Sequence, residues 1–142
     1  MDKGLNILGI ARKAGRLEIG EEPVCAAARG KYARLILVAS DAADNTRRRA
    51  ENCSGYCTAP VIEVDFTKEE LGRIIGRGSC ALVAVCDPGL AHLFVREIAA
   101  GDSERYGELA EELRRRAERA ERRAREKRLR GKSRQTGKKR GG

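Results

Sequence analysis

Along residues 1–100, short apolar runs alternate with segments whose apolar residues recur at helical spacing. The apolar runs predict four strands, at residues 17–20, 33–40, 59–64 and 80–87. The periodic segments around them predict five helices, at residues 5–15, 21–30, 41–57, 66–76 and 88–100. This alternation predicts an α/β fold, a three-layer α/β/α sandwich around a short mixed, mostly parallel sheet.

Residues that commonly begin helices support several of these boundaries. Thr67 and Glu70 have the spacing of a capping box, in which each side chain accepts a hydrogen bond from the other residue's backbone N–H. Asp41 or Asp44 is placed to cap the helix predicted at 41–57, and Pro88 suits a first helical turn.

Residues 101–142 differ from this body in pattern and in charge. They hold 16 Lys/Arg against 8 Asp/Glu, whereas residues 1–100 are nearly balanced, with 14 against 13. Glu-first pairs at i,i+4 favour a helix, and Tyr106 and Leu113 belong to a heptad-like seam that is otherwise alanine. We expect a domain at 1–100, then a solvated single helix that ends in a disordered segment from Gly131 onward.

The charge of this extension favours a polyanionic partner. Between Arg114 and Arg140 there are 15 Lys/Arg and 3 Glu, which is more than solubility requires. Each phosphate that such residues neutralise adds salt-sensitive affinity without sequence information. The alternative is an extension that only keeps the protein soluble.

The five cysteines predict reduced thiols in a cytoplasmic protein, since their number is odd and neither a secretory signal nor a membrane-spanning apolar run is visible. Cys53 and Cys57 have the spacing of half a zinc site, but no second pair completes it. Cys25, Cys80 and Cys86 are better explained as small buried side chains. No metal is expected.

The residues also argue against catalysis. His92 is the one histidine, and the sequence places no acid or nucleophile beside it. Neither of the glycine-rich phosphate-binding motifs occurs, so no nucleotide cofactor is expected. We therefore expect a binding protein and not an enzyme.

Three loop segments are candidates for a binding surface, because ligands of α/β/α domains usually meet the loops at one end of the sheet. The first is Gly20-Glu21-Glu22, where the N–H groups of a helix start are available to phosphate or base edges. The second is Asp41 to Arg49, which ends in the arginine run at 47–49; for this run a solvated helix face is the alternative. The third is Arg77-Gly78-Ser79, just before the last strand.

Three segments, taken in order and with their spacing, resemble the ribosomal protein L-seven-Ae / L-thirty-e superfamily, in its bacterial YlxQ-like branch. They are LNILGIARKAGRL, ILVASDAADNT and KEELGR, at residues 5–17, 36–46 and 68–73. The resemblance covers roughly residues 4–99. It implies an α/β/α sandwich that binds RNA, typically a kink-turn, which is a sharply bent helix with tandem sheared G·A pairs.

The resemblance also implies where RNA would bind. The helix that contacts RNA in this superfamily begins at a position matching Gly20, and the second contact loop matches residues 77–79. Ribosomal members commonly have an Asn-Glu pair after the glycine and a Lys further along the helix, where this chain has Glu22, Pro23 and Ala26. Glu22 can accept hydrogen bonds from guanine but cannot donate one.

Together these observations predict a non-enzymatic, monomeric, ribosome-associated protein that binds structured RNA, with ribosomal RNA and ribosomal proteins as partners and no membrane. The candidate RNA-binding residues are Arg12, Lys13, Arg16, Gly20, Glu21, Glu22, Arg47, Arg77, Gly78 and Ser79. The alternatives are a protein-interaction module, or an accessory domain of an RNA-modifying system. In either case the extension at residues 101–142 would bind nucleic acid non-specifically.

Overall fold

The computed structural model describes the backbone of residues 3–141 and the side chains of residues 3–131. Helices and strands alternate from residue 3 to residue 101, as the sequence predicts. The elements are α1 (Lys3–Lys13), β1 (Leu17–Ile19), α2 (Glu21–Arg29), β2 (Leu35–Val38), α3 (Asp44–Ser54), β3 (Val61–Glu63), α4 (Lys68–Ile74), β4 (Leu82–Val85), α5 (Pro88–Gly101) and α6 (Ser103–Gly141).

The four strands form one mixed sheet in the order β1-β4-β2-β3. β2 and β3 are parallel, whereas β4 is antiparallel to both of its neighbours, β1 and β2. The expectation of a mostly parallel sheet is therefore wrong, although the α/β class is confirmed. β1, β2 and β3 run in one direction; β4 alone is reversed, and its position between β1 and β2 makes two of the three pairings antiparallel.

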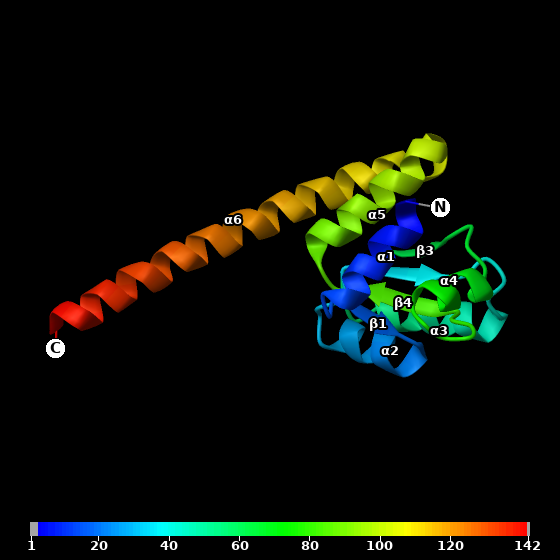
Figure 1. Cartoon of the computed structure of the whole chain (residues 1–142), viewed down its shortest axis with the longest axis horizontal. Helices are drawn as coiled ribbons and strands as arrows, with labels where there is room; N and C mark the ends of the chain where they lie inside the picture. The colour runs from blue at the N-terminus through cyan, green and yellow to red at the C-terminus, as the bar shows by residue number, and fades with distance from the viewer. Residues whose placement is uncertain (1–2, 142) are drawn as a thin grey trace.

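The sheet is covered by helices on both faces (Figure 1). α2 and α3 pack together on one face, while α1 and α5 cover the other with α4 beside α1. β2 and β4 are buried along their whole length, as the continuous apolar runs predict for central strands. Leu35, Ile36 and Leu37 of β2 have no exposed surface, and Phe94 of α5 is equally enclosed. The three-layer sandwich is thus confirmed.

The helix starts follow the sequence with one exception. Thr67 and Glu70 form the predicted capping box, each side chain accepting from the other residue's N–H at 3.1 Å. Neither Asp41 nor Asp44 caps α3, whose N-cap is Ala43 with no side-chain bond. Asp41 accepts instead from the backbone N–H of Lys68 at 2.8 Å, so it stabilises the start of α4.

The first part of α6 is docked on the body and is not a solvated helix. α5 and α6 form an antiparallel helical hairpin (Figure 1). Tyr106 and Leu113 of the predicted seam are only 4% and 2% exposed and belong to the hydrophobic core. The seam therefore packs inside its own chain, and the core continues beyond residue 100. From Glu121 to Gly131 every residue is exposed.

A polar contact fixes the start of α6 to the edge strand β3. The Tyr106 hydroxyl and the Arg105 guanidinium both donate to the carbonyl oxygen of Glu63, each at 2.9 Å. Arg105 also pairs with Asp65 at 3.0 Å and lies over the Tyr106 ring, 4.8 Å from its centroid. Burial raises the pKa of Tyr106, which keeps the hydroxyl proton in place for this bond.

Two further features differ from expectation. Cys25 of α2 and Cys53 of α3 form a disulfide with a Cα–Cα distance of 5.3 Å, so reduced thiols are the wrong expectation for this pair. The two cysteines are 28 residues apart, and nothing in their local sequence signals the pairing. In addition, α6 continues to Gly141, although disorder is expected from Gly131 onward.

Docking of α6 makes Leu113 a stability determinant. Leu113→Ala should lower the free energy of unfolding by about 2–5 kcal/mol, because it opens a cavity under α6. Leu129→Ala is the matched control on the same helix, since Leu129 is 62% exposed; it should change stability by less than about 0.5 kcal/mol. Urea titrations followed by circular dichroism measure both. Equal effects would contradict the docking.

The disulfide should contribute to stability in the same assay. Adding dithiothreitol should lower the free energy of unfolding by about 3 kcal/mol, since the bridge restricts the unfolded chain. A Cys25→Ala, Cys53→Ala double variant is the control and should not respond to dithiothreitol. A wild-type protein that is equally unresponsive would show that the bridge does not form in solution.

Candidate functional site

The turn at Gly20 joins β1 to α2 and requires a glycine. Gly20 has a φ of 95°, a conformation that a side chain disfavours. Its N–H donates to the carbonyl of Leu82 at 2.9 Å, which ties the turn to the start of β4. Glu21 and Glu22 follow in the first turn of α2, whose leading N–H groups have no acceptor within the helix.

The loop before β4 is packed closely on α4. The N–H of Arg77 donates to the carbonyl of Gly72 at 2.7 Å, and the N–H of Cys80 donates to that of Lys68 at 2.9 Å. A Cβ on Gly72 would lie 2.7 Å from the Ser79 Cα, which is closer than real contacts. Glycine at 72 therefore allows the loop at 77–79 to rest on the helix.

These two segments, distant in sequence, meet at a small cavity of about 160 Å³. Its polar lining comes from the α2 start, from α3 and from the loop at 77–79: Gly20, Glu21, Thr46, Arg77 and Ser79. Cys80 and Leu82 form part of its apolar wall. The structure thus brings together residues of all three segments that the sequence singles out, with Thr46 as the contribution of the second.

The carboxylates at the α2 start are paired with α3. The Thr46 hydroxyl donates to Glu21 Oε1 at 3.2 Å. The Arg49 guanidinium lies 3.7 Å from Glu21 Oε2 and bonds Glu22 as well. The Glu22 side chain stays 77% exposed, so it remains open to a ligand. Sequence reasoning missed this role of Thr46 and Arg49, whose only signal is an i,i+3 spacing on α3.

Arg47 does not line the cavity. Its guanidinium donates to the carbonyls of Ser40 at 2.9 Å and Ala42 at 3.2 Å, and it forms an ion pair with Glu63. These bonds join the loop before α3 to the end of β3. Arg47 therefore holds these segments together, and its RNA-binding role stays a prediction.

The three basic residues near the end of α1 separate in space. Arg12 lies against the turn at Gly76, where an added Cβ would come within 3.4 Å of its Nη2, so it adjoins the loop at 77–79. Lys13 is exposed in the last turn of α1. Arg16 lies at the other end of β1, where its carbonyl accepts from the N–H of Cys86 at 2.8 Å. None of the three lines the cavity, and Arg12 is the one that lies beside the loop at 77–79.

The titratable groups near the sheet are not set up for catalysis. Burial raises the pKa of Cys80, whose thiol donates to the Leu82 carbonyl at 3.3 Å, and raises that of Cys86 to about 11. Thiols that stay protonated at neutral pH are poor nucleophiles. Burial and the charge of Arg96 lower the pKa of His92, which lines a separate pocket between α5 and α6.

The described part of the chain lacks two other features that would suggest a function. No group of three or more His, Cys, Asp or Glu residues there is arranged to hold a metal ion. No helix there combines the length and apolar character needed to cross a membrane.

Comparisons with known proteins agree on one family. The family model described as the Ribosomal protein L7Ae/L30e/S12e/Gadd45 family matches residues 2–95. A protein of Enterococcus faecium named RNA-binding protein YlxQ is 36% identical over 75 residues, covering 53% of this chain and 72% of that protein. A Bacillus subtilis protein of the same name is 33% identical over 89 residues, covering 63% and 88%.

A solved structure supports the same fold. A protein of unknown function from Bacillus halodurans superposes with a TM-score of 0.62 at 31% identity, covering 69% of this chain and 98% of that one. The family match ends at residue 95, within α5, so all of α6 lies beyond it.

The tight packing of the loop at 77–79 gives a direct test of the cavity wall. Gly72→Ala should lower the free energy of unfolding by about 1–3 kcal/mol, because its Cβ displaces backbone atoms of the loop. Gly78→Ala is the control, since a Cβ there meets no atom within 4 Å. Chemical denaturation measures both variants. A tolerated Gly72→Ala would show that the loop is not held against α4.

Proposed function

The chain belongs to the ribosomal protein L7Ae/L30e/S12e/Gadd45 family, and on that basis we propose that it is a non-enzymatic protein that binds structured RNA. The proposal draws on the relatives named RNA-binding protein YlxQ and on the cavity between the α2 start and the loop at 77–79. The target is a bent, kink-turn-like RNA helix, and ribosomal RNA is the class to test first. We also propose that the protein acts as a monomer in the cytoplasm, with the Cys25–Cys53 disulfide as an exception to the reduced state of cytoplasmic thiols.

One observation carries the proposal: the Gly20 turn and the Arg77–Ser79 loop line the same cavity. The free N–H groups of α2 are hydrogen-bond donors for phosphate or for base edges. Arg77 and Ser79 are exposed on the opposite wall, where a guanidinium and a hydroxyl can contact the sugar-phosphate backbone. Recognition would depend on the shape of the RNA backbone and on a few base contacts.

The carboxylates of Glu21 and Glu22 are more compatible with RNA binding than their negative charge alone suggests. Arg49 offsets part of the negative charge of Glu21 and Glu22, which reduces their repulsion of phosphate. Because Glu22 remains exposed, its carboxylate can still accept from the N1–H and N2–H₂ groups of guanine. Arg49 also supplies a cation beside the α2 start, where Ala26 has no charge to offer.

The same pairing weighs against the alternative of a protein-interaction module. A basic protein partner would have to compete with Arg49, which already pairs with both Glu21 and Glu22. The accessory-domain alternative has no feature of the described residues in its favour.

RNA titration tests the proposal. The full chain should bind a kink-turn RNA more tightly than a control RNA whose G·A pairs are disrupted. Arg77→Ala should weaken binding by about threefold to tenfold and reduce the salt slope by about 1, because one phosphate contact is lost. The control is Arg73→Ala, which removes an exposed arginine that pairs with Glu69 on α4. Equal affinity for the two RNAs would rule out kink-turn recognition.

Glu22→Ala tests the base contact separately. If Glu22 accepts hydrogen bonds from guanine, the variant should lose discrimination between the two RNAs. The difference between their binding free energies should shrink by about 1–3 kcal/mol. If the carboxylate only repels RNA, the variant should bind both RNAs more tightly, and the base contact would be excluded.

A further inference from the structure

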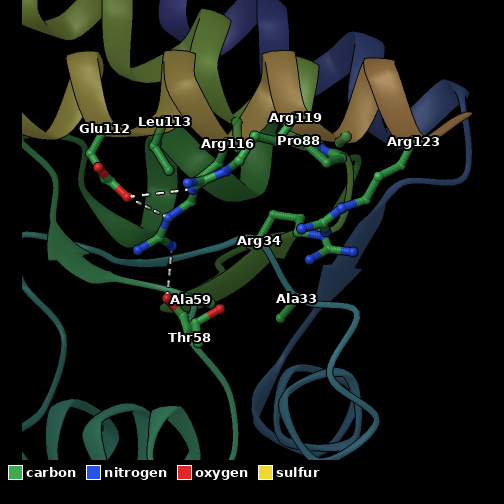
Figure 2. A pocket seen from close by; sticks show the side chains of 12 residues that line it. Ala33, Arg34, Thr58, Ala59, Pro88, Glu112, Leu113, Arg116, Arg119 and Arg123 are labelled. Carbon is green, nitrogen blue, oxygen red and sulfur yellow. Dashed lines mark hydrogen bonds and ion pairs between the residues drawn. The ribbon is translucent and has the colours of Figure 1, made fainter. Parts of the chain in front are cut away.

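A second, larger cavity of about 530 Å³ lies between α6 and the body. Its walls come from four parts of the chain: the segment before β2, the segment before β3, the start of α5 and the middle of α6. Figure 2 shows Arg116 and Arg123 reaching from α6 toward Thr58 and Arg34. The floor is apolar and includes Ala33, Ala59 and Leu113.

The cavity has a large excess of positive charge. Its charged lining is four arginines and one carboxylate: Arg34, Arg116, Arg119, Arg123 and Glu112. We call this set of four arginines and the space between them the arginine groove. Glu112 lies 3.0 Å from Arg116 and 3.9 Å from Arg119. Among the described residues, no acidic side chain pairs with Arg34 or with Arg123, and both are exposed.

The groove is held in shape by the docking of α6. Leu113, Arg116, Ala120 and Arg123 are spaced by three and four residues, so they share one face of the helix. Leu113 is buried in the core beneath that face. Arg116 donates to the Thr58 carbonyl at 2.8 Å, which bridges α6 to the segment before β3. These contacts fix the Arg116 side chain and set the position of the helix backbone that carries Arg119 and Arg123.

We propose that the arginine groove is a second RNA-binding site, which takes phosphates of the RNA backbone. Guanidinium groups bind phosphate oxygens through paired hydrogen bonds, and their planar shape matches that geometry. The inference rests on the proposed function, but it assigns the contact to particular residues. Arg34 belongs to the body and the other three belong to α6, so the site exists only when α6 is docked.

The arginine groove and the smaller cavity beside Gly20, which we call the Gly20 cavity, lie at opposite ends of the sheet. Gly20 bonds Leu82 at the start of β4, whereas Arg34 bonds Val85 at the end of β4. Arg16, which adjoins Cys86, is at the groove end and adds another cation there. An RNA helix long enough to contact both ends would be held at two points.

Two exposed tyrosines favour RNA over other polyanions. Tyr32 is 46% and Tyr56 is 57% exposed. Each precedes a residue of the groove lining by two positions, Arg34 and Thr58 respectively. Unpaired bases of RNA stack on such rings, whereas a plain polyanion gains nothing from them.

The test compares two double variants of the full chain that remove the same charge. Arg34→Gln with Arg123→Gln should weaken binding of the kink-turn RNA and of its G·A-disrupted control equally, by at least about tenfold, and lower the salt slope by about 2. Arg128→Gln with Arg130→Gln removes two exposed arginines from the free part of α6 and should weaken binding by less than about threefold. Equal losses from the two pairs would overturn the groove in favour of diffuse tail charge.

A second measurement on the wild-type chain does not depend on how the variants fold. Phenylglyoxal modifies accessible arginines, and mass spectrometry locates the products. Bound RNA should protect Arg34, Arg123 and Arg77. Protection of Arg77 without Arg34 and Arg123 overturns the groove but keeps the proposed function. No RNA binding and no protection at all overturns the proposed function itself. Protection of the groove by polyglutamate and not by RNA would make it a protein site and overturn the inference.

Discussion

The antiparallel pairing of β4 with both β1 and β2 is the constraint on which both candidate sites depend. Because β4 runs opposite to its neighbours, its start meets the end of β1, and its end meets the starts of β1 and β2. The first junction brings the Arg77–Ser79 loop to Gly20. The second brings Arg34 and Pro88 to the cavity that α6 completes. In a parallel arrangement β4 would begin at the opposite end of the sheet, and these segments would not meet.

The docking of α6 changes how its positive charge can act on a nucleic acid. A free helix rich in arginine would attract any nucleic acid in any orientation, because its charges move with the helix. Here Tyr106 and Leu113 are buried, so the arginines that follow keep fixed positions relative to Arg34 on the body. The same seam also explains why cutting the chain at residue 100 would uncover part of the core.

Local signals in the sequence are sufficient to predict the helices and strands of residues 1–100. They also identify segments that line the cavity beside Gly20, but not that these segments meet. The apolar runs at β2 and β4 identify the central strands, and Thr67 with Glu70 identifies a helix start, because these features depend on neighbouring residues alone. Three other features depend on residues that are distant in sequence, for which a single sequence offers no spacing rule. They are the direction of β4, the Cys25–Cys53 disulfide and the bonds of Arg49. The arginine run at 47–49 is an example, because its three cations cannot be told apart in the sequence. In the structure Arg47 donates to the Ser40 carbonyl within the fold, whereas Arg49 pairs with Glu22 at the candidate site.

The contact of Tyr106 and Arg105 with Glu63 has a consequence for how the protein is made. β3 is at the edge of the sheet, and an uncovered edge strand can pair with other chains. Since a polypeptide emerges from the ribosome starting at its N-terminus, β3 appears well before the residues that occupy its last carbonyl. Until residue 106 has emerged, the Glu63 carbonyl at this edge has no partner from α6, and pairing with other chains can compete with folding during this interval.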